Sequence, residues 1–75
     1  MFANTYELSA AGFLAAAAQE SRKLGGHMRL LRIAQAKGNR SGVAFCAKRV
    51  QESAERVESL LTLATEWAEM DETRA

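Results

Sequence analysis

The side chains that could do chemistry are few and scattered. His27 is the only histidine and Cys46 the only cysteine among the 75 residues, so the chain lacks the ligands of a structural zinc site and the second thiol of an internal disulfide. A lone histidine beside Gly25 and Gly26 is more often a helix-start or surface residue than a ligand or base. We therefore expect Cys46 to be a small buried hydrophobic residue and His27 to have no catalytic role.

The acidic and glycine-containing stretches also lack the order that catalysis or phosphate binding requires. Glutamates between residues 52 and 69 fall on the polar side of a predicted helix, which is typical of solubilising charges rather than of a paired acid and base. The glycine pair at 25–26 and the stretch KGNRSG at 37–42 match neither a P-loop nor a dinucleotide fingerprint. We expect no catalytic residues, no metal site and no cofactor, and hence no enzyme.

Charge is distributed unevenly along the chain, although the net charge is only +1. Residues 1–20 carry a net −2, residues 21–51 carry +8 without a single acid, and residues 52–75 carry −5. A basic span of this kind can contact nucleic-acid phosphates or an acidic protein surface. The candidate basic patch consists of Arg29, Arg32, Lys37, Arg40, Lys48 and Arg49.

Part of this basic span resembles a DNA-binding element. Residues 30–47, LLRIAQAKGNRSGVAFCA, resemble the opening of the helix-turn-helix in Fis-type regulators, where Gly-Asn followed by polar residues precedes a helix with paired alanines. The resemblance covers under a quarter of the chain and implies a small DNA-binding regulator. It ends after Ala47, where KRVQESAERV continues one helix without a turn or a separate recognition helix.

A long amphipathic helix over about residues 42–70 positions many of these side chains. Two series recur every seven positions and form one narrow stripe, which is spacing typical of a coiled coil. The series are Val43, Val50, Val57 and Ala64, and Cys46, Ser53, Leu60 and Trp67. On the polar side, Lys48, Glu52 and Arg56 stand four residues apart and can pair along the surface. The stripe widens towards its end, which predicts a partner-binding or dimer interface of Leu60, Leu63, Trp67 and Met70.

An earlier helix is expected over about residues 5–37. Asn4 with Glu7 resembles a capping box, and Ser9 is a second candidate cap. Alternating steps of four and three predict an inner seam, with Phe13 adding bulk beside it. The predicted seam residues are Ala10, Leu14, Ala17, Ser21, Leu24, Met28 and Leu31.

The glycine pair decides between two folds. Gly25 and Gly26 cost about 1 kcal/mol each inside a helix, so a break there would give a three-helix monomer. The seam keeps its phase across them, which favours a continuous helix and a two-helix hairpin. Residues 38–42 are the clearest turn, with Gly38 after the helix end and a cap for the next helix at Asn39 or Ser41. Residues 71–75 are expected to fray.

The sequence therefore predicts one all-α domain, a long helical hairpin that dimerises into an antiparallel four-helix bundle. In that dimer the acidic end of one hairpin lies beside the basic turn of the other. We expect a small cytoplasmic regulator that acts through protein–protein contact as an adaptor, chaperone or inhibitor, of a size that phages and plasmids encode. The alternative is a DNA- or RNA-binding regulator that uses residues 21–51. No stretch approaches the ~20 apolar residues of a membrane span.

Overall fold

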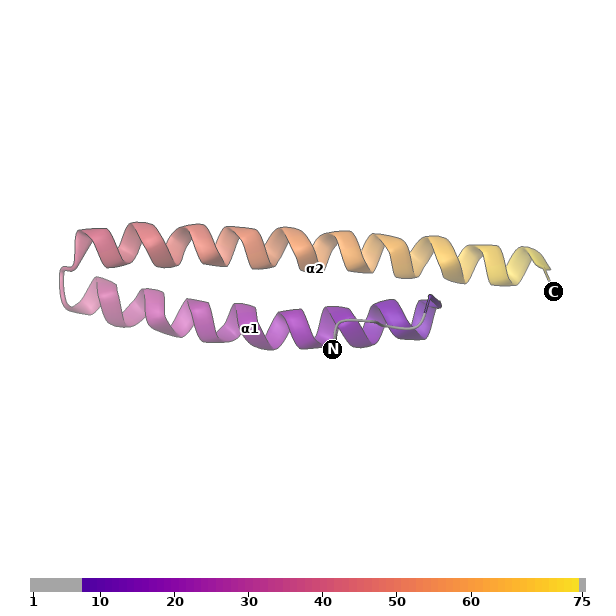
Figure 1. The fold of residues 1–75 in the computed structure, drawn as a ribbon, viewed down its shortest axis with the longest axis horizontal. Helices are drawn as coiled ribbons and strands as arrows, with labels where there is room; N and C mark the ends of the chain where they lie inside the picture. Colours follow the sequence, from indigo (N-terminus) through magenta and orange to yellow (C-terminus); the bar gives the residue numbers. More distant parts are fainter. Residues whose placement is uncertain (1–7, 75) are drawn as a thin grey trace, which may run out of the picture.

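The computed structural model describes residues 8–74 and shows two antiparallel helices joined by a tight turn (Figure 1). Helix α1 spans Ala10–Ala36 and helix α2 spans Arg40–Arg74. The two helices pack against each other along their length and form a single layer (Figure 1). No strand occurs among the described residues. The predicted all-α hairpin is confirmed.

Helix α1 begins at its second candidate cap and is continuous. The side-chain oxygen of Ser9 accepts a hydrogen bond from the backbone N–H of Gly12 at 3.0 Å, which satisfies one donor of the first turn. The predicted capping box of Asn4 and Glu7 lies outside the described residues. The helix runs through the glycine pair at 25–26 without a break. The three-helix alternative is therefore wrong.

The turn is stabilised at both helix ends by hydrogen bonds. Gly38 has a φ of 67°, a left-handed conformation that a glycine adopts at little cost. Its N–H donates to the carbonyl of Gln35 at 3.1 Å, and the N–H of Asn39 donates to the carbonyl of Ala34 at 3.0 Å. The side chain of Asn39 then accepts from the N–H of Gly42 at 3.0 Å. The predicted roles of Gly38 and Asn39 are confirmed, but the turn is shorter than predicted.

Helix α2 turns its predicted stripe towards α1. Every member of the two heptad series is buried or half-buried. Near the open end the rings of Phe13 and Trp67 pack with centroids 5.8 Å apart and planes inclined by 56°. Helix α2 continues past Met70 to Arg74, where fraying was expected, and extends beyond the start of α1 (Figure 1). Because α2 is uninterrupted, no separate recognition helix follows the turn.

The inner seam of α1 differs from the predicted one. Three residues predicted to face inwards are exposed, namely Leu14, Ser21 and Met28. The seam instead runs in steps of three and then four, so Phe13, Glu20 and His27 face inwards in their place, and Ala34 continues the same row. His27 is half-buried in the middle of α1 rather than at a helix start or on the open surface. Both seams share the same four residues, Ala10, Ala17, Leu24 and Leu31, so the spacing alone fits either.

The interior of the hairpin is shallow. Among the described residues, the buried hydrophobic ones are one phenylalanine and four alanines: Phe13, Ala16, Ala17, Ala34 and Ala64. The large apolar side chains that remain exposed are Leu8, Leu14, Met28, Leu30, Ile33, Phe45, Leu61, Leu63 and Met70. The hairpin therefore leaves much of its large apolar surface for contacts outside itself.

Candidate functional site

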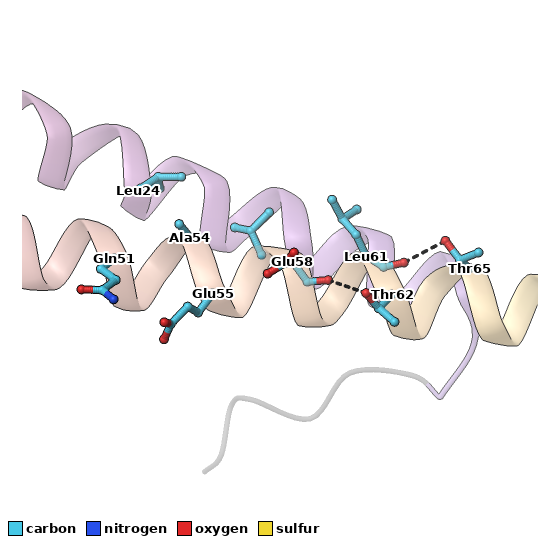
Figure 2. Close-up of a pocket in the computed structure, with 9 residues that line it drawn as sticks. Leu24, Gln51, Ala54, Glu55, Glu58, Leu61, Thr62 and Thr65 are labelled. Atoms are coloured by element: carbon cyan, nitrogen blue, oxygen red, sulfur yellow. Dashed lines mark hydrogen bonds between the residues drawn. The ribbon is translucent and has the colours of Figure 1, made fainter.

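One face of the hairpin carries an open groove of about 650 Å³, here named the α2 groove (Figure 2). Leu24 is its contribution from α1, and the rest of its lining comes from residues 51–65 of α2, which make about four turns. The full lining is Leu24, Gln51, Ala54, Glu55, Val57, Glu58, Leu61, Thr62 and Thr65. Leu24 lies opposite Ala54, and Gln51 and Glu55 lie on the side of α2 away from α1 (Figure 2).

The two threonines of the α2 groove have their hydroxyl groups satisfied within α2. Thr62 Oγ1 donates to the backbone carbonyl of Glu58, and Thr65 Oγ1 donates to that of Leu61, both at 3.0 Å (Figure 2). A hydroxyl that already has an acceptor costs less to remove from water than one that loses its partner. These threonines can therefore line an apolar contact.

The four predicted interface residues do not form one surface. Leu60 and Trp67 are half-buried on the stripe that faces α1, and Trp67 packs on Phe13. Leu63 and Met70 are exposed and lie outside the α2 groove. The spacing of the stripe did not separate inward from outward residues at its wide end.

Leu61 is a groove residue that the predicted interface omitted. It is 45% exposed and lines the α2 groove together with Ala54, which stands seven residues before it. The sequence feature that could have identified Leu61 is its position beside the stripe, seven residues after the small residue Ala54. A second apolar row next to the first indicates a second contact surface.

The basic patch is exposed at the turn end of the hairpin. Its six members come from the last part of α1, the turn and the first part of α2, and all are exposed. Arg49 is partly engaged within α2, because its Nη1 lies 3.5 Å from Glu52 Oε1 and its guanidinium lies 5.0 Å from the Phe45 ring centre. Glu52 thus pairs with Arg49, whereas Lys48 and Arg56 were the predicted partners. The patch concentrates positive charge at one end of the molecule.

A polar cluster that the sequence pattern did not indicate joins the two helices. Arg56 donates from Nε to Oε2 of Glu20 at 3.0 Å and from Nη2 to Oγ of Ser53 at 3.4 Å. Ser53 is fully buried, and the side chain of Glu20 is only 12% exposed. Burial raises the pKa of Glu20, but the hydrogen bond and charge of Arg56, the Ser53 hydroxyl and the charge of Lys23 outweigh it, so the pKa is lowered overall.

Comparison with known proteins does not identify a family for this chain. The chain matches no family model, no curated protein and no solved structure. Within the part of the chain that the structure describes, no three metal-binding side chains come together. Neither α1 nor α2, over their described lengths, is long and apolar enough to cross a membrane.

Proposed function

We propose that this chain is a small non-enzymatic regulatory protein that acts through protein–protein contact, as an adaptor, chaperone or inhibitor of a larger protein. The observation that carries this proposal is the set of large apolar side chains that the hairpin leaves exposed, including Leu63 and Met70 outside the α2 groove. Methionine and aromatic residues are enriched at protein interfaces, and large exposed apolar patches are uncommon on proteins that act alone.

The proposed working form is a homodimer, an antiparallel four-helix bundle made from two hairpins. A stable domain is built from at least two packed layers, and the hairpin is one layer. A chain of this length rarely gains more than about 3–5 kcal/mol from its own core. A second hairpin supplies the missing layer. The proposed compartment is the cytoplasm, because a single half-buried Cys46 suits a reducing environment.

The test begins with the mass of the protein in solution. Light scattering across protein concentrations should give a mass near twice 8.2 kDa. Tagged protein is then used to capture a binding partner, whose affinity is measured for wild type and for the double variant Leu63→Ala with Met70→Ala. We expect this variant to bind the partner at least ten-fold more weakly while its helicity and mass stay unchanged.

A matched variant at the other end of the molecule controls for a general loss of apolar surface. Leu30→Ala with Ile33→Ala removes two exposed apolar side chains of α1 and should leave the partner affinity within two-fold of wild type. If wild type and the Leu63→Ala, Met70→Ala variant bind the partner with equal affinity, these two residues are not part of the interface. If the tagged protein captures no specific partner, the proposed function is contradicted.

A second candidate function is binding of DNA or RNA by the basic patch, and the exposure of all six basic residues at the turn end favours it. Contacts to phosphate release counterions, so such binding weakens steeply as salt rises. A gel-shift assay with short duplex DNA and RNA at low and moderate salt tests it. Lys37→Ala with Arg40→Ala should lower both the affinity and its salt dependence. Binding that is unchanged by salt would count against this function.

A further inference from the structure

We infer that the α2 groove is occupied by the same groove of a second copy of this chain, with the turn of one hairpin beside the open end of the other. The inference rests on the proposed homodimer and assigns its interface and direction. It places the second copy on the groove face and leaves the exposed Leu63 on the other side of α2 free for a different protein.

A row of apolar and small side chains continues along the groove face of both helices, and Glu55 and Glu58 line the groove beside this row. Helical spacing of seven residues from Ala54 places Ala47, Leu61 and Ala68 on the same side of α2, and all three are exposed. On α1 the exposed Met28 follows Leu24 by one turn, on the same side of the helix. Small residues between larger ones allow two helices to approach closely and interdigitate.

The size of this face suits a stable dimer. Helix α1 has 27 residues, so it is about 40 Å long, and two helices side by side are about 20 Å wide. The face therefore offers about 800 Å², which is close to what each partner buries in an interface of standard size. The threonine hydroxyls of the groove keep their acceptors within α2 when it is covered.

The charges of the two ends determine the direction in which the copies pack. Lys37 and Arg40 lie exposed at the turn, and Glu66 and Asp71 lie exposed near the open end. Two hairpins packed with their turns together would bring the basic ends side by side, where like charges repel. With the turns at opposite ends, each basic turn lies beside an acidic end. This arrangement also relieves the unfavourable positions of cations at the start of α2 and acids at its end.

The direction predicts which residues meet across the two-fold axis. Ala54 lies near the middle of the paired part of the hairpin, opposite Leu24 (Figure 2). In an antiparallel, isologous dimer the axis crosses this level, so the two copies of Ala54 lie close to each other. A cysteine at this position should form a disulfide with its own counterpart.

The direction is tested by cross-linking in a Cys46→Ser background, which removes the native cysteine. Ala54→Cys should give a disulfide-linked dimer under mild oxidation, whereas Ser59→Cys, an exposed control on the other side of α2, should stay mainly monomeric on a non-reducing gel. Preferential linkage through Ser59→Cys, or equal linkage of both, would overturn the assigned face.

The interface itself is tested with two leucines that lie two residues apart. Leu61 lines the α2 groove and Leu63 does not, yet both are exposed in the single hairpin, so neither change needs to disturb its fold. We expect Leu61→Glu to weaken dimerisation at least 100-fold and Leu63→Glu to change it less than three-fold, measured by light scattering over protein concentration. Circular dichroism checks that both variants remain helical.

The outcomes separate this inference from the function on which it rests. If Leu63→Glu dissociates the dimer and Leu61→Glu does not, the groove is not the interface, while the proposed homodimer stands. If wild-type protein is a monomer at all concentrations, both the homodimer and this inference fail. Partner capture by a monomer would still support a role in protein–protein contact.

Discussion

Arg56 Nε lies 3.0 Å from Oε2 of Glu20, although 36 positions separate the two residues in the chain. This contact favours the observed alignment of the two helices, because a slip by one turn would bring Glu52 or Leu60 to the place of Arg56 and leave the inward-facing carboxylate of Glu20 without its partner. A carboxylate removed from water and left unpaired is strongly unfavourable. Ser53, fully buried beside the pair, adds a hydroxyl to the same cluster. The cluster therefore favours one alignment over its near alternatives.

The pairing predicts a loss of stability in acid. The pKa of Glu20 is lowered in the folded protein from a usual value of 4.5, so its ionised form stabilises the fold above that pH. This contribution is lost as pH falls below 4.5 through the lower pKa of the folded state. Glu20→Gln should cost about 1 kcal/mol at pH 7, a modest value because the Arg56 side chain is 54% exposed.

Urea unfolding at pH 7 and pH 3 measures this effect. The free-energy difference between wild type and Glu20→Gln should be clear at pH 7 and smaller at pH 3, which lies below the usual pKa of 4.5, because protons there bind Glu20 more tightly in the unfolded chain than in the folded one. Glu66→Gln is the control, because Glu66 is exposed and lies outside both the α2 groove and the cluster with Glu20. Equal pH dependence for wild type and Glu20→Gln would mean that the pair does not stabilise the fold.

The sequence predicted the stripe of α2 correctly, but three of the seven predicted seam residues of α1 incorrectly. In α2, the two heptad series are apolar or small throughout and the charged residues fall outside them, so one register fits. In α1, alanines lie on most sides and exposed residues such as Leu30 and Ile33 are as apolar as inward ones. The predicted seam did not include Glu20 or His27. Their inward position depends on residues in α2, such as Arg56, which spacing within α1 does not include.

The candidate site was predictable only in part for a similar reason. The widening of the stripe predicted a second partner surface, and Leu61, Leu63 and Met70 are exposed in that part of α2. It did not separate Trp67, which packs on Phe13, from Leu63 and Met70, which remain exposed. Which of these side chains α1 covers depends on where α1 begins, and the spacing within α2 does not give that position. The exposure of the basic patch followed from charge alone, because lysine and arginine are rarely buried.

Trp67 should prove to be a structural residue. Its ring packs on that of Phe13 near the open end, so Trp67→Ala removes an aromatic contact between the two helices there. We expect a loss of about 2–4 kcal/mol in the free energy of unfolding, measured with urea. Met70→Ala, a change at an exposed position, should cost less than about 0.5 kcal/mol. If Trp67→Ala left stability unchanged but abolished partner binding, Trp67 would belong to the partner interface.

Alanine substitutions of the glycine pair should stabilise the hairpin. A Cβ at Gly25 or Gly26 would meet no atom within 4 Å, and both residues lie inside a continuous helix. Each substitution should raise the free energy of unfolding by about 0.5–1 kcal/mol, because alanine loses less backbone freedom than glycine on helix formation.

The turn glycine provides the contrast that makes this prediction specific to a helix. Gly38→Ala should destabilise the protein by about 1 kcal/mol, because its φ of 67° strains a residue that has a Cβ. Thermal unfolding at one fixed protein concentration compares the three variants with wild type, since dimerisation makes the midpoint depend on concentration. We expect higher midpoints for Gly25→Ala and Gly26→Ala and a lower one for Gly38→Ala. A lower midpoint for the first two would show that the chain bends at these glycines instead of continuing as one helix.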